Sequence, residues 1–180
     1  MPEYRRAAFK GGTYFFTVNT FRRRPILTDV RCRAALRAAI ELTRTELPFE
    51  IVAWVLLPDH LHTVWRLPVG DANFALRWSL LKRHVTRTCR DGLPAQPLSD
   101  SRRKRREGTF WQRRYWEHLI RDDTDLLRHV DYVHYNPVKH GYVTRAIDWP
   151  HSTFHRYVAN GIYSAGWGGG LEPEGGEFGE

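Results

Sequence analysis

The chain has 180 residues, a mass of 21.2 kDa and a formal net charge of +8 at pH 7. That length fits one domain with a sizeable core and leaves too little chain for a second full domain. The positive charge and a pI near 9.9 indicate a polyanionic partner, with nucleic acid favoured over an acidic membrane surface. Because the sequence has neither 18 consecutive apolar residues nor a signal-peptide pattern, we expect no membrane span and a cytoplasmic location.

The first 70 residues alternate between strand-like and helix-like patterns. Runs rich in β-branched and aromatic residues predict strands, and a capping residue before apolar positions at helical spacing predicts a helix. In chain order these elements are a strand over residues 13–20, a helix from Thr28 or Asp29 to about Leu47, a central strand over 51–57 and, after the turn Pro58-Asp59, a strand over 60–67.

A His-x-His pattern, His60-Leu61-His62, opens the last of these strands. Side chains two positions apart on a strand point to the same face, so both imidazoles can bind one metal ion. Two unrelated histidines, at the surface or at a cap, are the alternative for this pattern taken alone. The sequence thus predicts a candidate metal site on a rigid element.

An amphipathic helix is predicted from Asp71 to about Arg90, because apolar residues recur there every three or four positions. Its other face carries cations without compensating carboxylates, namely Arg77, Lys82, Arg83, Arg87 and Arg90. A solvated face is the alternative, but the pattern favours a surface that contacts phosphates. The two cysteines, Cys32 and Cys89, lie within predicted helices and lack zinc-ligand spacing, which indicates buried core residues.

Less regular segments occupy the middle and the end of the chain. Residues 92–108 combine Pro and Gly with the basic cluster 102–106, which predicts a mobile loop. The aromatic residues 109–116 predict a strand. Residues 164–180 are rich in Gly and Glu and predict a flexible tail after a domain of residues 1–163. An inert tail is favoured over one that competes with DNA.

A helix is predicted from about Asp125 to Asn136, after a capping cluster at residues 122–125, and Pro137 is expected to end it. Its apolar stripe consists of Leu126, Leu127, Val130 and Val133. Tyr132 falls on the opposite side from Val130, with Asn136 one turn further on, so the periodicity predicts a tyrosine outside the core. A surface tyrosine and a phenol nucleophile beside a carboxamide ligand are both compatible with this position.

Short strands interleaved with helices indicate an α+β fold, an antiparallel sheet with helices packed on its faces. Several sequence blocks together resemble the REP-associated tyrosine transposases, a branch of the single-tyrosine HUH transposases. The blocks are Pro58-Asp59 with His60-Leu61-His62, residues 131–141 (DYVHYNPVKHG), Tyr4-Arg5-Arg6, Gly11-Gly12-Thr13, Phe110-Trp111-Gln112, Trp116-Glu117-His118 and residues 149–155 (WPHSTFH). A His-x-His pattern alone is a weak signal, but these blocks in one order across residues 1–160 are specific.

This resemblance implies an HUH-type fold with a ferredoxin-like or palm-like sheet. It implies a divalent metal, Mg²⁺ or Mn²⁺, held by His60, His62 and Asn136, and Tyr132 as the nucleophile. The implied reaction is cleavage and strand transfer of single-stranded DNA at a REP hairpin with a short 5′ guide, through a 5′-phosphotyrosine. The implied protein is a monomer. His118 remains open as a metal ligand or a residue of the active-site wall.

The expected DNA contacts combine the basic helix face with a family segment near the guide bases. They are Tyr4, Arg5, Arg6, Arg77, Lys82, Arg83, Arg87 and Lys139. A phenol titrates near pH 10, so the nucleophile needs activation, and the titratable neighbours are Asp131, His134 and His118. Other candidate nucleophiles are Tyr115, Tyr135 and Tyr142. Two rival functions remain, a catalytically idle REP-binding regulator and a metal-dependent nuclease that uses water.

Overall fold

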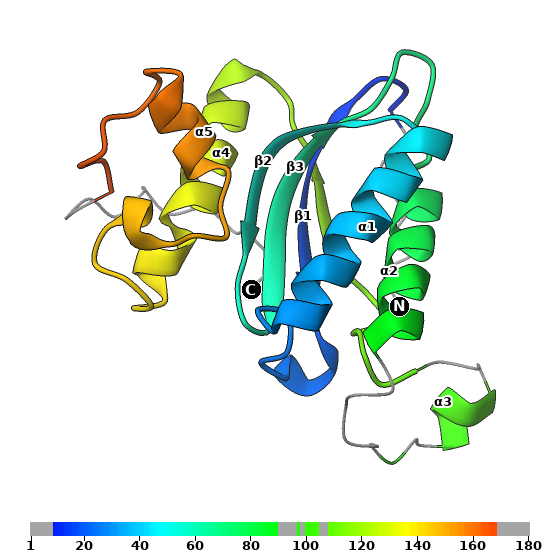
Figure 1. Ribbon diagram of the computed structural model, residues 1–180. Coiled ribbons are helices and arrows are strands. Elements are labelled where there is room, and N and C mark those ends of the chain that lie inside the picture. The colour runs from blue at the N-terminus through cyan, green and yellow to red at the C-terminus, as the bar shows by residue number, and fades with distance from the viewer. Residues whose placement is uncertain (1–8, 90–96, 98–99, 105–107, 169–180) are drawn as a thin grey trace.

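The computed structural model describes residues 9–89, 97, 100–104 and 108–168, and it has the expected α+β fold. Four antiparallel strands form one sheet in the order β2-β3-β1-β4. Helices cover both of its faces, α1 and α2 on one side and α4 and α5 on the other (Figure 1). The strands are β1 (Thr13–Asn19), β2 (Glu50–Leu56), β3 (His60–Arg66) and β4 (Trp116–Leu119); the helices are α1 (Val30–Glu46), α2 (Phe74–Cys89), α3 (Asp100–Lys104), α4 (Asp123–Lys139) and α5 (Phe154–Ala159).

The two central strands, β1 and β3, are covered on both faces, which explains why nearly every residue in them is buried. Their register pairs Thr17 with His62 and Asn19 with His60. Side chains directly opposite each other in an antiparallel pair point to the same face of the sheet. Residues of β1 and β3 therefore divide into a set facing α1 and α2 and a set facing α4.

The layer between the sheet and α1 with α2 holds the larger core. The ring of Trp65 stacks on that of Trp78 at 4.2 Å, and Phe16 packs against both. Cys32 and Cys89 are 2% and 3% exposed and belong to this core, as the sequence predicts. Asp29 caps α1 by accepting a hydrogen bond from the backbone N–H of Arg31 at 2.9 Å.

The layer on the other face holds a smaller core in which α4 packs on β2 and β3. Helix α4 is also covered on its far side, where the ring of His134 lies 4.7 Å from that of Tyr157 and 5.5 Å from that of Tyr163. Tyr132 is consequently only 2% exposed, and the expectation that it lies outside the core is wrong. A single apolar stripe does not describe a helix that is buried on two sides.

Two element boundaries differ from the sequence prediction. The strand expected over residues 109–116 is absent; Phe110 and Trp111 fill the larger core instead, and β4 begins only at Trp116. Helix α4 also continues past Pro137 to Lys139. Pro137 lies in the last turn, where its missing N–H removes one helical hydrogen bond, and the N–H of His140 still bonds the carbonyl of Asn136 at 3.0 Å.

The expected loop and tail are described only in part. Within residues 92–108, the short helix α3 is described. Within residues 164–180, the described part packs on the domain, with the ring of Trp167 4.5 Å from that of Tyr163. The rest of both segments lies outside the described residues, as do Tyr4, Arg5, Arg6 and Arg90. None of the described helices has the length and apolar character that crossing a bilayer requires.

The structure corrects the prediction that Arg77 contacts phosphates. Its guanidinium is fully buried and donates hydrogen bonds to three backbone carbonyls, those of Leu47, Pro48 and Asn73. Its Nη2 also lies 2.7 Å from Oδ2 of Asp71. Arg77 therefore fastens the loop before α2 to the end of α1. Arg77 is a cation, as the sequence pattern requires, but its charge is paired with Asp71 inside the fold and does not face solvent.

The ion pair of Arg77 predicts a pH-dependent stability. The hydrogen bond from Arg77 lowers the pKa of Asp71. Replacing Asp71→Asn should lower the free energy of unfolding at pH 7 by about 1–3 kcal/mol, because a buried cation loses its counter-charge. The difference from the wild type should shrink as the pH falls below about 4, the ordinary pKa of an unfolded Asp, and toward the lowered pKa of Asp71 in the folded protein, where the wild-type carboxylate protonates. Chemical denaturation between pH 7 and pH 3 measures both.

The matched control is Asp148→Asn, since its ion pair with Arg145 is exposed to solvent. That change should alter stability little at either pH. A constant loss for Asp71→Asn across the pH range would mean that the charge of Asp71 does not stabilise the fold.

Candidate functional site

The candidate site begins with His60 and His62, which lie on the α4 face of β3 and are fully buried. Their ring centroids are 4.8 Å apart. The Nδ1 of His60 lies 2.7 Å from Oδ1 of Asp59, and the Nδ1 of His62 lies 2.9 Å from the hydroxyl of Thr17. Because Nδ1 of each ring is held by a neighbour, Nε2 is the nitrogen that each ring presents to a ligand.

These histidines fit a divalent metal. The Nε2 of His60 is buried without a hydrogen-bond partner in the described part of the chain, and such an atom is costly unless a ligand satisfies it. The Asp59 carboxylate on Nδ1 of His60 is the kind of partner that orients metal-bound imidazoles in known sites. Imidazole nitrogens suit first-row transition-metal ions, and an amide carbonyl oxygen suits Mg²⁺ and Mn²⁺.

Helix α4 brings a second set of side chains to the histidines. Tyr132 and Asn136 are four residues apart and lie on one face of the helix, and the C-cap residue His140 follows Asn136 by another four. The ring of Tyr132 lies 5.2 Å from that of His62, and the ring of His140 lies 5.1 Å from that of His60. Asn136 lies between them along the helix and is fully buried.

Lys139 reaches the same site. Its Nζ lies 3.3 Å from the hydroxyl oxygen of Tyr132 and 4.9 Å from the centre of the ring. The sequence prediction makes Lys139 a DNA contact and does not link it to Tyr132, and it names His140 within a family block without giving it a role in the site. The spacing in the sequence could have indicated both residues, because side chains four or seven positions apart lie on one face of a helix. Lys139 follows Tyr132 by seven residues, and His140 follows Asn136 by four.

A strained turn supports Asp59. Arg22 and Arg23, in the 3₁₀ turn Phe21–Arg23, have φ values of 56° and 53°, a left-handed conformation that L-residues seldom adopt. The Nε of Arg23 lies 2.7 Å from Oδ2 of Asp59, whose other oxygen meets His60. Burial raises the pKa of Asp59, but its hydrogen bond to His60 and the charges of His60 and Arg23 outweigh this, so the pKa is lowered.

His118 lies in a separate cluster. Its Nε2 is 2.9 Å from Oδ2 of Asp125, and its ring stacks on that of His129 at 4.6 Å. Phe15 separates this cluster from the histidines of β3, because its ring is 4.9 Å from that of His129 and 5.6 Å from that of His62. His118, Asp125 and His129 could hold a metal ion by the closeness of their donor atoms. Asp125, however, already accepts hydrogen bonds from Arg121.

The other titratable candidates are engaged away from Tyr132. The Nε2 of His134 is 2.9 Å from the hydroxyl of Thr153, and burial lowers the pKa of His134 to about 3, which keeps its ring neutral. Asp131 accepts a hydrogen bond from Tyr163. Tyr115 packs on Trp78 in the core on the opposite face of the sheet.

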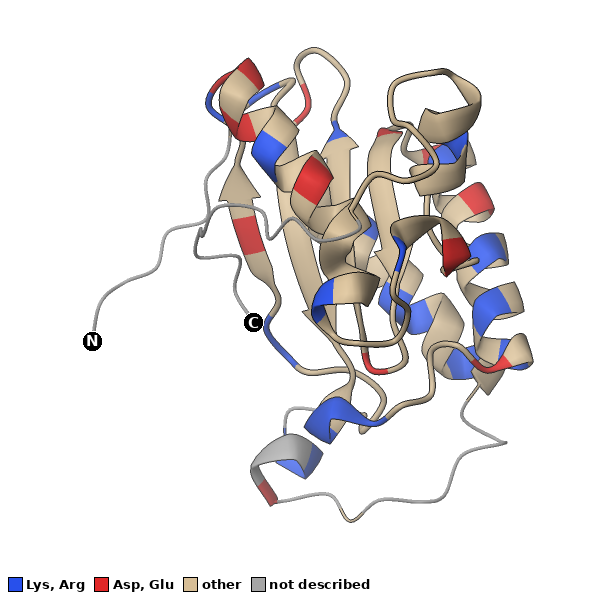
Figure 2. Cartoon of the chain, turned by 90° about the vertical axis from the view of Figure 1, so that its left-hand side faces the viewer, with Lys and Arg blue, Asp and Glu red and all other residues tan. Residues whose placement is uncertain are grey.

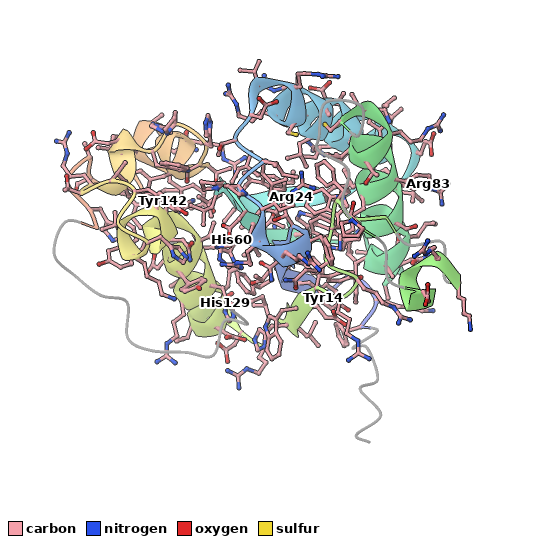
Figure 3. The ribbon with its side chains drawn as sticks, turned by 90° about the horizontal axis from the view of Figure 1, so that it is seen from below. Tyr14, Arg24, His60, Arg83, His129 and Tyr142 are labelled. Carbon is pink, nitrogen blue, oxygen red and sulfur yellow. The ribbon has the colours of Figure 1, made fainter. Side chains whose placement is uncertain are left out.

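The predicted DNA contacts of α2 lie on the far side of the sheet from the candidate site. Figure 3 shows Arg83 on α2, well away from His60 and His129. Arg83 and Arg87 are exposed, whereas Lys82 donates a hydrogen bond to the carbonyl of Gln112 at 3.3 Å. Further Lys and Arg residues gather on and beside α3, at the lower end of the molecule in Figure 2.

No family model matches the sequence. Three similar proteins, in contrast, carry the same family name. The chain is 47% identical to the REP-associated tyrosine transposase of Escherichia coli K12, over 94% of this chain and 92% of that protein. It is 49% identical to a putative REP-associated tyrosine transposase of Haemophilus influenzae, over 94% of each. A solved REP-associated tyrosine transposase bound to a REP hairpin has a TM-score of 0.83 at 45% identity, covering 100% of this chain and 98% of that one.

Two variants distinguish the two histidine clusters as metal sites. Asp59→Asn should weaken Mn²⁺ binding about 10- to 100-fold in calorimetry, because the carboxylate orients His60 and makes it more basic. His118→Ala should leave the Mn²⁺ affinity unchanged. The reverse result, with affinity lost only in His118→Ala, would assign the metal to the cluster of His118, Asp125 and His129. Thermal unfolding of both variants controls for loss of the fold.

Proposed function

The chain belongs to the REP-associated tyrosine transposases, and we propose that it is a metal-dependent enzyme that cleaves and rejoins single-stranded DNA at REP-type hairpins. The observation that carries this proposal is the meeting of Tyr132 with His62, at 5.2 Å between ring centroids, in a buried site that also contains His60 and Asn136. A nucleophile and a metal-binding pair come from different elements and meet at one point.

The proposed metal ligands are His60, His62 and Asn136, and the metal is Mg²⁺ or Mn²⁺. A divalent cation there would polarise the scissile phosphate and neutralise the charge that develops on it. Asp59 and Thr17 hold the Nδ1 atoms of the two imidazoles, so that Nε2 is the nitrogen that each ring would offer to the metal. Burial of the pair excludes water, which strengthens its interaction with a phosphate.

Tyr132 is the proposed nucleophile. Its hydroxyl oxygen attacks the phosphorus and forms an ester with the 5′ end of one DNA fragment. The bond from phosphorus to the 3′ oxygen breaks, and that oxygen takes up a proton and leaves as a 3′-hydroxyl. A new phosphodiester replaces the old one, so the bond energy needed for rejoining is retained in the 5′-phosphotyrosine.

Lys139 is the proposed activating group for Tyr132. A phenol titrates near pH 10, and a positive charge within hydrogen-bond distance of its oxygen favours the phenolate. The Nζ of Lys139 donates to that oxygen at 3.3 Å. The same cation would stabilise charge on the tyrosine oxygen when the strand is rejoined and Tyr132 becomes the leaving group.

The structural relative at 45% identity is bound to a REP hairpin, and we propose a hairpin substrate for this chain also. Candidate phosphate contacts are the exposed Arg83 and Arg87, together with Lys82 and Lys139. Tyr4, Arg5 and Arg6 stay proposed contacts to the guide bases, outside the described residues. We propose that one monomer carries the complete site, because β3 and α4 of a single chain supply the histidines and Tyr132.

The nucleophile is tested with Tyr132→Phe. That variant should form no covalent adduct and cut no strand while keeping its affinity for the hairpin, because it lacks only the attacking oxygen. Incubation with an end-labelled REP hairpin and Mn²⁺, followed by denaturing electrophoresis, detects both the adduct and the cut strand. A wild type that cuts without an adduct would be a nuclease that uses water, and a wild type that binds without cutting would be a regulator. Tyr135→Phe is the matched control.

The surface of α2 is tested by salt dependence. Reversing both Arg83→Glu and Arg87→Glu should reduce the slope of log K against log salt by roughly 2, because each lost duplex phosphate contact contributes about 0.9. Arg66→Glu is the control, since Arg66 lies at the opposite end of β3 from His60 and pairs with Glu50. An unaltered slope in the double variant would show that the hairpin does not reach α2.

A further inference from the structure

A stacked aromatic pair, the exposed Tyr142 and the partly buried Trp149, lies beside the proposed metal ligands. Tyr142 is 44% exposed, and its ring stacks on that of Trp149 at 5.4 Å with an interplanar angle of 29°. Trp149 is held in place by its indole N–H, which donates to the carbonyl of Leu56 at 3.0 Å. One face of the tyrosine ring is thus backed by a fixed indole.

The chain after α4 directs Tyr142 toward the site. Gly141 has a φ of +70°, which lets the backbone reverse at the end of the helix, and the N–H of Tyr142 bonds the carbonyl of Pro137 at 3.0 Å. The ring of His140 lies 6.0 Å from that of Tyr142 and 5.1 Å from that of His60. The ring of His140 therefore lies between those of Tyr142 and His60, and Figure 3 shows Tyr142 and His60 in the same region.

The charges around Tyr142 favour a strand of nucleic acid. Burial is the largest cause of the raised pKa of the Tyr142 phenol, and the charge of Asp59 raises this pKa further while that of Arg23 lowers it. Asp59 is already paired with Arg23 and His60, whereas the side chain of Arg23 is 38% exposed and can meet a phosphate. An aromatic face with a cation at its edge is the arrangement that binds single strands.

Core packing does not account for the exposed ring. Trp149 packs against the smaller core, whereas Tyr142 belongs to neither core cluster and is 44% exposed. A flat π surface beside a nuclease centre offers a base a place to stack, and only an unpaired base has a face available. Duplex bases already stack on their neighbours.

We propose that Tyr142, mounted on Trp149, is a stacking platform for one unpaired nucleobase of the strand that adjoins the scissile phosphate. The proposal rests on the proposed function, because it takes the strand to pass His60. It adds a subsite to that function, in which the base fixes the strand and so positions the phosphate between His60 and Tyr132.

The test is a thermodynamic cycle in the Tyr132→Phe protein, which requires no cleavage. The probe is a synthetic REP hairpin that this protein binds, carrying single-stranded flanks in which one position at a time is made abasic. At one flanking position, the abasic change and Tyr142→Ala should each weaken binding roughly 5- to 150-fold, and the two together should weaken it no further than either alone.

Three further variants make the outcome specific. Tyr142→Phe keeps the ring and should bind like the parent protein, whereas Tyr142→Leu keeps apolar bulk without a π face and should lose the coupling. Ile162→Ala removes another exposed apolar side chain and should change nothing. Losses that multiply at every flanking position, or no loss for Tyr142→Ala at any of them, would overturn the platform.

Failure of the platform and failure of the proposed function are distinguishable. The absence of a covalent adduct in the wild type would overturn the function and leave the binding cycle intact. A normal adduct with no coupling between Tyr142 and any flanking base would overturn the platform alone.

Discussion

The register between β1 and β3 is the constraint on which the site depends. Pairing Thr17 with His62 puts both histidines, Thr17 and Phe15 on the α4 face of the sheet. A slip of one residue would move the histidines to the other face, into the layer of α1 and α2. The large side chains of Phe16 and Trp65 prevent this slip, because they fill that opposite layer. The core that is remote from the chemistry thus sets the direction of the metal ligands.

Helix α4 provides the other half of the site, and its position depends on being held from both sides. Val130 and Val133 pack on β2 and β3, while His134 and its neighbours meet α5 and the segment that follows. The distance from Tyr132 to His62 is therefore set by packing rather than by a flexible side chain. Residues 20–27 brace the same end of the sheet, where the N–H of Leu27 bonds the carbonyl of Pro58 at 2.8 Å.

The sequence predicts the strands and helices well wherever one periodic pattern dominates. The strand with His60 and His62 and the helix capped by Asp29 are examples, because alternation and capping are local signals. The exposure of Tyr132 and Arg77 could not be predicted in this way. Each depends on what packs against a second face, which is a property of the tertiary structure. The contacts of Thr17 and Asp59 with the histidines, and of Arg23 with Asp59, depend on the strand register and on the turn at residues 21–23. Neither is a local property of the sequence.

The burial of Tyr132 bears on the fate of a strand once it has been cut. An ester between DNA and a tyrosine can be resolved either by a 3′-hydroxyl or by water, and only the first outcome restores an intact strand. A nucleophile that is 2% exposed, enclosed by Phe15, His62 and Lys139, gives water poor access to the phosphorus. The fold that hides this tyrosine would therefore bias the partition of the intermediate toward rejoining, and so limit the number of broken strands left by abortive turnover.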